Sequence, residues 1–482
     1  MNETAKPVVL VWLHQDLRLS DHPAFTAASS SGFGVVPLYI LDDETPAGWK
    51  MGGASRWWLH HSLAALDASL HGFGSRLILK RGRAEAVLED MLKTLPVKAI
   101  YQHQHHEPWA AERQDRIAGL CRQHDVAHHV SLGSLLAQPG VVRGKTGGRL
   151  KVFTPFKRNL LNQVSPSAPL QTPQNPIPAP ESWPSSLALK QLGLLPEKPD
   201  WSAGFTACWQ VGELAAQQRL DNFLKTAVSS YAKGRDLPSI EGTSRLSPHL
   251  HFGEISPRQV FSAVMDACNG IPDEDASSFL SEIIWREFSY ELLDQFPSMP
   301  EHPIRAEFSH FPWAEDAAML AAWQRGRTGY PLVDAGMRQL WHEGWMHNRV
   351  RMICGSFLTK HLLLPWQAGA DWFFDTLVDA DLASNSAGWQ WVSGCGADAA
   401  PYFRIFNPIS QGAKFDAAGY VRHWLPVLAG LSDKDIFSPW AAPQGELMAA
   451  GVRLGENYPM PLVDHPTARQ RALAAFASIR QT

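Results

Sequence analysis

The sequence has almost no excess of charge and few cysteines. Across 482 residues the formal net charge is −4, which excludes a uniformly basic surface and requires that any nucleic-acid-binding region be local. The cysteines are too scattered for a zinc site, an iron–sulfur cluster or a disulfide framework, so we expect a reducing compartment, the cytoplasm, and no metal ion. The five are Cys121, Cys208, Cys268, Cys354 and Cys395.

Long hydrophobic runs and a glycine-rich turn are also missing. No apolar stretch approaches the length that crosses a bilayer, and the N-terminal "PVVLVWL" is too short for the core of a signal peptide, so we expect no membrane anchor. The turn after it, "HQDLRLSDHPAF", contains no glycine. A dinucleotide fingerprint needs glycines there to admit the pyrophosphate, which argues against a standard NAD site.

Residues 1–132 alternate between strand-like and helix-like segments. This rhythm predicts parallel strands joined by crossover helices, an α/β domain with a doubly wound sheet. The expected strands are 7–13, 33–41, 75–81, 97–103 and 125–132, and the expected helices are 54–70, 84–95 and 110–122.

The rest of the chain divides into a connector and a helical domain. Residues 164–200 are dense in proline and lack helical periodicity, so they indicate an extended segment within a connector over 133–203. From 204 to 482 long apolar-periodic segments dominate, which predicts an all-α domain. The two clearest expected helices are 276–296 and 334–363.

Tryptophan is abundant, with 19 residues, 13 of them beyond residue 200. One stretch, "DADLASNSAGWQW" at 379–391, combines two acids, an amide and two indoles. Core packing would account for the indoles but not for the carboxylates, so this stretch indicates a site.

Polar residues share stripes on both long predicted helices. The spacing in 276–296 indicates either a functional face or an amphipathic surface with one Glu–Arg pair. The spacing in 334–363 indicates either a site or a packed helix with solvated arginines. The residues are Glu282, Trp285, Arg286 and Ser289 on the first, and Trp345, Asn348 and Met352, with Arg349 and Arg351 beside them, on the second.

A third polar segment is "YAKGRDLPSIEGTSRLSPHLHFGEISPRQ" at 231–259. Hydroxyls and amides near a helix N-terminus bind phosphate well, although a simple loop with a helix cap would give the same pattern.

Six motifs occur in order along the helical domain: "EGTSRLSP", "EIIWREF", "TGYPLVDAGMRQL", "GWMHNRVRM", "DADLASNSAGWQW" and "DAAPYFRIFNPISQGAKFD". Together they closely resemble the photolyase/cryptochrome family, and within it the DNA photolyases that repair cyclobutane pyrimidine dimers. The resemblance covers essentially the whole chain. "GGASRWWLHHSLAAL" and "LLPEKPDW" are most similar to the class III subgroup related to plant cryptochromes, with class I as the alternative.

The resemblance implies that the all-α domain holds FAD bent into a U, while the α/β domain carries an antenna pigment. Asp379 and Arg351 would pair, which offsets the penalty for burying either alone. The positions that match phosphate-holding segments are Tyr231, Thr243, Ser244, Arg245, Leu246 and Ser247. Those that match the flavin-side shell are Glu282, Arg286, Trp345, Asn348, Arg351, Asp379 and Asp381, with Asn385 beside flavin N5.

The resemblance also implies roles in light-driven electron transfer to a flipped-out dimer. An acid beside N5 could protonate the flavin, whereas the Asn385 amide cannot, so Asn385 suits a fully reduced flavin. Trp391 and Trp285 match the pair that holds the dimer. Trp389, Trp366 and Trp313 match the chain that carries electrons to the flavin. The matching catalytic set adds Glu282 and Asn348, and the matching DNA contacts add Arg235, Arg349, Met352 and Arg404.

We expect a monomeric enzyme that repairs dimers in DNA. Three other functions compete with this interpretation. A cryptochrome photoreceptor disagrees with Asn385, Asn348 and Trp391, and the chain stops at "LAAFASIRQT" without a signalling tail. Repair of (6-4) photoproducts uses a His where this sequence has Asn348. A flavoprotein that does not use light has no need of a dimer pocket.

The antenna region departs most from the family. Relatives commonly have Arg where His14 stands, and an Asn and a Tyr before Glu-Pro where "QHQHHEP" stands. Glu107 matches the residue that holds the pterin ring of methenyltetrahydrofolate, so we expect this folate, weakly bound because His cannot replace the two-pronged Arg. A metal site joining the loop 101–109 to His60 or His61 is the less favoured alternative to an ordinary surface loop.

Overall fold

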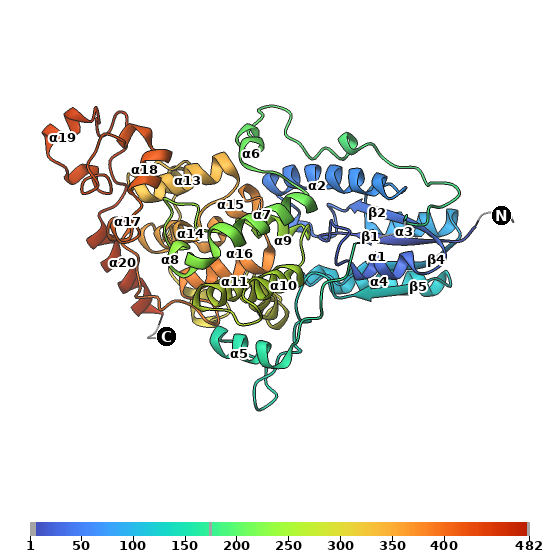
Figure 1. The fold of residues 1–482 in the computed structure, drawn as a ribbon. Coiled ribbons are helices and arrows are strands. Elements are labelled where there is room, and N and C mark those ends of the chain that lie inside the picture. Colours follow the sequence, from blue (N-terminus) through green and yellow to red (C-terminus); the bar gives the residue numbers. More distant parts are fainter. Residues whose placement is uncertain (1–5, 173–175, 480–482) are drawn as a thin grey trace.

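The computed structural model describes residues 6–172 and 176–479. Figure 1 shows an α/β domain beside a larger helical domain, which confirms the predicted fold class. Among the described residues, no helix is both long and apolar enough to cross a membrane.

The α/β domain is built on a five-stranded parallel sheet in the order β3-β2-β1-β4-β5. Along the central strand, Val9 and Val11 face one helical layer and Leu10 and Trp12 face the other, so both sides of the sheet are buried. The strands are β1 Val8–Leu13, β2 Gly34–Leu41, β3 Ile78–Arg81, β4 Val97–His103 and β5 Ala127–Ser131. The helices are α1 Pro23–Ser29, α2 Gly53–Gly72, α3 Ala84–Thr94 and α4 Pro108–Gln123.

From β1 the chain first adds β2 and β3 on one side and then β4 and β5 on the other, so the direction of strand addition reverses between the neighbours β1 and β4. In open α/β sheets such a reversal leaves a crevice at the carboxyl ends of the strands. Here the histidine-rich loops after β1 and β4 come together at that edge.

The sequence did not indicate α1, which begins where His22 Nδ1 accepts a hydrogen bond from the Phe25 amide (3.1 Å).

The helical domain contains almost no regular strand structure in its described part. Its long central helix α11 buries Phe279, Ile283, Leu292 and Leu293, as the apolar spacing predicts. The helices are α6 Ala203–Cys208, α7 Glu213–Thr226, α8 Tyr231–Gly234, α9 Ser247–His251, α10 Pro257–Ala267, α11 Glu274–Gln295, α12 Ala317–Gln324, α13 Pro331–Glu343, α14 Asn348–Ser356, α15 Trp366–Thr376, α16 Leu382–Ser393, α17 Pro408–Lys414, α18 Ala418–Trp424, α19 Gln444–Ala449 and α20 His465–Ser478.

The single helix predicted over 334–363 is wrong. The chain forms α13 and α14 with a break between them, because Gly344 adopts a left-handed conformation (φ 65°) that ends α13. The His347 side chain then caps α14 by accepting a hydrogen bond from the Arg349 amide (3.3 Å). Trp345 therefore lies in the break, not on a helical face shared with Asn348.

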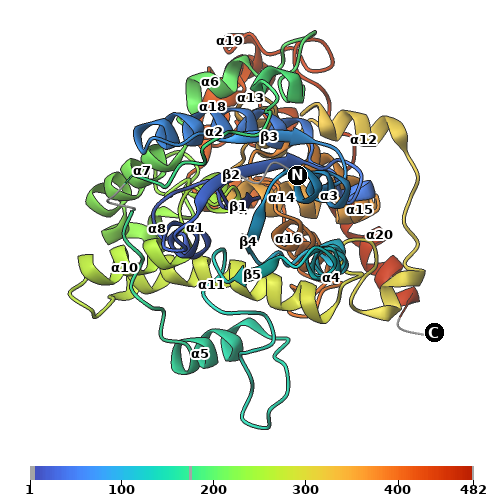
Figure 2. The same ribbon diagram turned by 90° about the vertical axis from the view of Figure 1, so that its right-hand side faces the viewer.

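The connector is more structured than the proline-rich sequence indicates. It includes a helix that no pattern predicted, α5 Phe153–Gln163, which projects from the body in Figures 1 and 2. Phe156 and Leu160 of α5 are buried against α11, and Leu192 and Leu194 pack on the α/β domain. We propose the division into 1–132, 133–203 and 204–482 on this arrangement.

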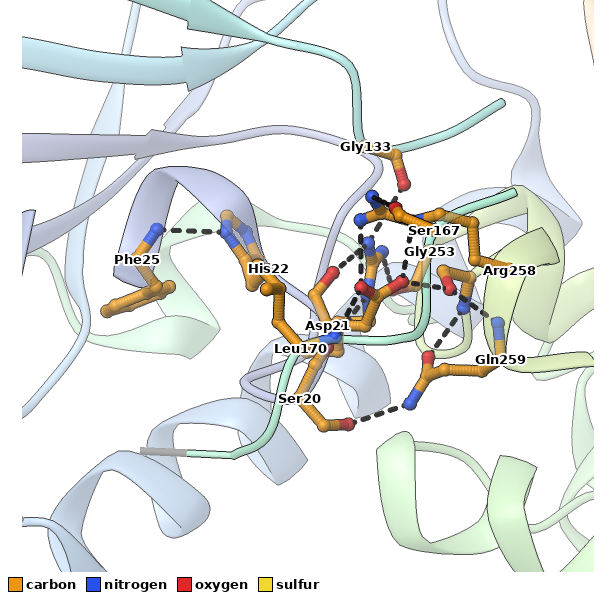
Figure 3. Close-up of polar contacts among 12 residues, drawn as sticks. Ser20, Asp21, His22, Phe25, Gly133, Ser167, Leu170, Gly253, Arg258 and Gln259 are labelled. Carbon is orange, nitrogen blue, oxygen red and sulfur yellow. Dashed lines mark hydrogen bonds and ion pairs between the residues drawn. The ribbon is translucent and has the colours of Figure 1, made fainter. Parts of the chain in front are cut away.

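Buried polar contacts fix the two domains to each other, and Figure 3 shows their centre at Asp21. Arg258 of α10 pairs with this fully buried carboxylate at 2.8 Å, and the Leu170 amide of the connector donates to it at 3.0 Å. Arg18, which is also fully buried, donates to the carbonyls of Gly133 and Gly253, each at 2.9 Å. Buried charges without partners are costly, so this interface tolerates little displacement.

Candidate functional site

One cavity of about 580 Å³ brings together nearly all the predicted site residues. It opens among α8, α11, α14, α16 and the loop before α9. Every predicted flavin-contacting residue lines it, as does every predicted DNA-contacting residue except Arg404. These residues are Tyr231, Arg235, Thr243, Ser244, Arg245, Leu246, Ser247, Glu282, Trp285, Arg286, Trp345, Asn348, Arg349, Arg351, Met352, Asp379, Asp381, Asn385, Trp389 and Trp391.

The predicted pairing of Arg351 with Asp379 is confirmed. Arg351 Nη2 lies 2.9 Å from Asp379 Oδ2, and the aspartate side chain is only 3 % exposed. The other oxygen, Oδ1, is buried and accepts no hydrogen bond from the described residues. A buried acceptor of this kind requires a donor. The ring N–H of a flavin in the cavity would satisfy it, so this carboxylate fits FAD.

Asp381 caps α16 and lies in a buried polar network. It accepts hydrogen bonds from the Ser384 amide (2.7 Å) and from the Tyr290 hydroxyl, and His251 is 3.7 Å away. Burial opposes ionisation, but His251 and the charge of Arg286 hold the pKa of Asp381 well below its usual range. Sequence reasoning missed His251 and Tyr290, since neither stands out in its motif.

Asn385 lies one turn further along α16 and faces the cavity. Its amide Nδ2 donates a hydrogen bond to the Ala370 carbonyl on α15 (3.0 Å). The side-chain oxygen accepts no hydrogen bond from the described residues, which leaves it free for a ligand. This arrangement holds the amide in one orientation at the cavity wall.

The three predicted electron-transfer tryptophans belong to the core of the helical domain. Trp389 is buried, lines the cavity and packs edge-on against Phe373, with ring centroids 5.0 Å apart. Trp366 on α15 is also buried, and Trp313 is half-buried. Of the three, Trp313 is therefore the one with appreciable contact with solvent. Trp323, which no pattern indicated, also packs against Trp389 (6.2 Å).

The predicted dimer-holding residues also line the cavity, but one of them has an unexpected neighbour. The Trp285 ring stacks on Phe153 of α5, with centroids 3.7 Å apart and an interplanar angle of 6°. The Phe153 amide donates to Asp398, another cavity residue, at 2.8 Å. Trp391 lies on α16 and is half-buried. The connector therefore supports one wall of the candidate lesion pocket.

Ion pairs surround the cavity mouth. Glu282 does not pair with Arg286 on its own helix, as one interpretation expected; it pairs with Arg235 at 2.6 Å. Burial raises the pKa of Glu282, and Arg235 offsets part of that rise. Arg286 instead donates to the Ser134 carbonyl (2.6 Å).

Two predicted DNA-contacting arginines lie in different settings. Arg349 pairs with Asp236 and covers the Phe415 ring at 4.4 Å. Arg404 makes no side-chain hydrogen bond or ion pair with the described residues. The buried Lys360 holds its backbone by donating to the Arg404 carbonyl (2.9 Å), and the arginine does not line the cavity.

The segment before α9 supplies the predicted phosphate-binding groups. Arg245 has a left-handed backbone (φ 50°) and pairs with Glu343 of α13 at 2.8 Å. Its guanidinium also lies over the Trp345 ring at 4.5 Å. Because α9 has only five residues, the hydroxyls of Thr243, Ser244 and Ser247 contribute more to an anion site here than the helix does.

Glu107 lies at the start of α4, at the crevice beside β4. Its carboxylate is buried and 3.5 Å from His105 Nδ1. Burial opposes ionisation, but His105 lowers the pKa of Glu107 to about 2, so the group is anionic. The His14 ring packs against Trp12 and His105, each at 4.1 Å. A pigment edge at this carboxylate would displace or join His105.

One buried cluster near this crevice has the composition of a metal site. In the described part of the chain, Asp16, His22 and His103 form the one group of three potential ligands, which includes neither His60 nor His61. However, His22 Nδ1 accepts the Phe25 amide proton, so in neutral His22 the proton is on Nε2, 3.3 Å from Asp16. With its proton on Nε2, this ring nitrogen of His22 has no lone pair to offer a metal ion, which disfavours metal ligation.

Comparisons with known proteins agree with this geometry. Residues 9–181 match the family model of DNA photolyase, and residues 279–478 match that of the FAD binding domain of DNA photolyase. A deoxyribodipyrimidine photo-lyase from Agrobacterium fabrum is 48 % identical over 98 % of both chains. Cryptochrome-1 from Arabidopsis thaliana is 37 % identical over 98 % of this chain and 70 % of its own length.

A solved structure is also closely similar. The crystal structure of a bacterial class III photolyase from Agrobacterium tumefaciens superposes with a TM-score of 0.96 at 46 % identity, covering 100 % of this chain and 99 % of that one. Both family models, the match of the relatives over nearly all of this chain and the shared fold lead to one conclusion: this chain belongs to the DNA photolyase family.

Proposed function

We propose that this protein is a light-dependent lyase that repairs cyclobutane pyrimidine dimers in DNA, with FAD as cofactor. The observation that carries the proposal is that one cavity contains both the flavin-side residues around Asp379 and Asn385 and the aromatic pair Trp285 and Trp391. The name of the Agrobacterium relative, a deoxyribodipyrimidine photo-lyase, supports it. The similarity to a class III structure favours that subgroup over class I.

Different residues of the cavity would serve different steps of repair. When bound, FAD supplies the photoexcited electron donor. Asp379, held by Arg351, would orient the flavin ring, and the hydroxyls before α9 would hold its phosphates. Trp285 and Trp391 would receive the flipped dimer, whose stacking in the duplex is already impaired. Glu282 and Asn348 line the same space and can donate or accept hydrogen bonds with the pyrimidine carbonyls and N–H groups.

The lesion chemistry is redox-neutral. Two carbon–carbon bonds of the cyclobutane ring break and two carbon–carbon double bonds form, so the electron that enters the dimer is returned and no reductant is consumed. The cavity therefore does not need a site for a second substrate.

A cryptochrome photoreceptor is the main alternative, because plant cryptochromes are also similar along the chain. The amide at Asn385 argues against it, since a photoreceptor cycle gains from an acid beside the flavin. Repair of (6-4) photoproducts is disfavoured by Asn348, where that reaction uses a histidine.

The direct test of the proposed function is a repair assay with defined lesions. The protein, loaded with reduced FAD, is mixed with one oligonucleotide carrying a cyclobutane thymine dimer and another carrying a (6-4) photoproduct. We expect blue light to restore the first to intact thymines, to leave the second unchanged, and to do neither in the dark. Repair of the second alone, or of neither, would overturn the proposal.

DNA binding must rely on local cations because the net charge is −4. The exposed cations Arg143, Lys145, Lys151 and Arg158 lie on or before α5, whose Phe153 stacks on the cavity residue Trp285. At the mouth, Arg235 and Arg349 are each paired with a carboxylate, whereas Arg404, outside the lining, has no such partner among the described residues.

We expect loss of Arg404 to weaken DNA binding through the phosphates. Each lost phosphate contact should make the slope of log affinity against log salt shallower by about one unit. Arg404→Gln is measured against lesion-containing DNA by fluorescence anisotropy at several salt concentrations, with Arg122→Gln on α4 as the control. An unchanged slope for Arg404→Gln would remove it from the interface. The same measurements on Arg235→Gln and Arg349→Gln rank the three arginines by the change in salt slope.

We propose methenyltetrahydrofolate as a weakly held antenna pigment with Glu107 as a ligand. The anionic, buried carboxylate supports this, because it suits the amino edge of a pterin. Purified protein incubated with the folate should gain a near-ultraviolet band that sensitises flavin fluorescence, and Glu107→Ala should lose it. Equal uptake by both proteins would exclude Glu107, and uptake of a deazaflavin alone would exclude the folate.

We also propose that the protein acts as a monomer in the cytoplasm. All five cysteines are free thiols, which suits a reducing compartment. Light scattering coupled to gel filtration tests the monomeric state.

A further inference from the structure

A second pocket, of about 360 Å³, lies far along the helical domain from the domain interface and shares no lining residue with the flavin cavity. It forms between the turn that joins α12 to α13 and the loop that follows α19. Three arginines line it: Arg325 and Arg327 from the turn, and Arg338 from the third turn of α13. Glu456 and Asn457 line the opposite wall.

The charges in this pocket are not balanced. Within the described ranges, none of the three guanidinium groups makes an ion pair or a side-chain hydrogen bond. The one acidic lining residue, Glu456, pairs with Arg453 at 3.2 Å, so it does not neutralise them. Three like charges around one small pocket repel each other, and an anion between them would remove that repulsion.

A single buried carboxylate fixes both walls of the pocket. Asp334, with no exposed surface, accepts hydrogen bonds from the amides of Thr328 (2.6 Å) and Gly329 (3.1 Å) in the arginine-bearing turn. It also accepts one from the Tyr458 hydroxyl (2.8 Å) beside Asn457. The arginines therefore project from a frame that is already ordered, which reduces the entropy cost of binding a ligand.

A simpler explanation accounts for only part of this arrangement. Arg325 and Arg327 follow the C-terminus of α12, where cations interact favourably with the helix carbonyls. Arg338 lies within α13, in its third turn, and has no such reason to face the same space. A ligand that needs several guanidinium groups explains all three.

We propose that the Arg325–Arg327–Arg338 pocket binds a phosphate group. Guanidinium groups present paired N–H donors that match the oxygens of phosphate, and three of them suit its tetrahedral shape and its charge. The phosphate has two candidate sources, the backbone of DNA outside the lesion or a free phosphate compound. The proposal does not depend on repair, because phosphate binding here requires neither light nor a lesion.

The first experiment titrates the FAD-loaded protein with pyrophosphate and measures binding by calorimetry. The variants Arg327→Gln and Arg338→Gln remove charge from an exposed and a partly exposed side chain and should not affect folding. The matched control is Arg469→Gln, at an exposed arginine on α20 that makes no ion pair with any residue of 6–172 or 176–479. Since a hydrogen bond to a charged group contributes about 1.5–3 kcal/mol, we expect each pocket variant to bind at least about tenfold more weakly than the control.

The second experiment distinguishes the source of the phosphate with undamaged duplex DNA in the dark. If the pocket contacts the DNA backbone, each pocket variant should have a salt slope about one unit shallower than that of Arg469→Gln. A loss of pyrophosphate binding with unchanged DNA slopes indicates a free phosphate compound. If pyrophosphate does not bind and the slopes are unchanged, or if Arg469→Gln is affected equally, the proposal is wrong.

Discussion

Replacing Trp389 with Phe should abolish photoreduction of oxidised flavin while leaving repair intact once the flavin is reduced chemically. Trp389 lines the cavity and is buried against Phe373, and we propose it as the indole that passes an electron to the flavin. Phenylalanine preserves most of the packing but is much harder to oxidise. Absorption spectra recorded during blue illumination measure the first activity, and the repair assay after dithionite treatment measures the second.

Replacing Trp391 with Ala should have the opposite effect. Trp391 is half-buried at the candidate lesion pocket, and loss of one aromatic stacking partner costs about 1–3 kcal/mol of binding per base. Photoreduction should continue at the wild-type rate. Affinity for dimer-containing DNA, measured by anisotropy against undamaged DNA of the same sequence, should fall toward the undamaged value.

The two substitutions control each other, and Trp183→Phe serves as a third variant. Trp183 packs beneath Arg76 on the α/β domain, with the guanidinium 4.9 Å from its ring, and contacts neither site. It should change neither activity. An equal loss of photoreduction and lesion binding in both Trp389→Phe and Trp391→Ala would refute the division of roles.

Replacing Asn385 with Asp should place a proton donor at the cavity wall and remove most of the repair yield. A carboxyl in this half-buried position would be protonated more readily than usual, because burial raises the pKa of acids. Under light with reductant, the bound flavin should develop the broad red absorption of a ring that has gained one electron and one proton, which the wild type should lack.

Asn385→Ala separates the proton from the lost hydrogen bond. Alanine can neither donate to the Ala370 carbonyl nor supply a proton, whereas the protonated aspartate can supply one. Red absorption in both variants, or normal repair by Asn385→Asp, would contradict the assignment of Asn385 to the flavin edge.

Much of the α/β domain and of the cavity lining could be predicted from the sequence. The inner strands appear in the sequence as short β-branched runs because both faces of the sheet are buried there, whereas the edge strand β5 is mostly exposed. The cavity residues came from motifs shared with a family, whose spacing already reflects the three-dimensional site. The pairing of Arg351 with Asp379 could be expected because neither charge is stable alone in a buried site.

The features that could not be predicted from the sequence were missed for physical reasons. The continuous apolar pattern over 334–363 hides the break at Gly344, because residues on both sides of it pack into the same core. Tyr290 and His251 act through contacts with Asp381 from distant positions in the chain, which no local pattern reports. The Arg338 pocket depends on a turn and a loop about 120 residues apart, which Asp334 brings together.

The stacking of Phe153 on Trp285 limits how far this protein can be divided. Phe153 precedes the helical domain by about 50 residues, yet its ring covers the face of a tryptophan that lines the candidate lesion pocket. A helical domain separated from its connector would lack that support and would expose α11 where Phe156 and Leu160 now cover it. The helical domain therefore does not form a complete unit by itself. A recombinant or fusion protein that contains only residues 204–482 would keep the flavin cavity but lack part of the wall of the candidate lesion pocket.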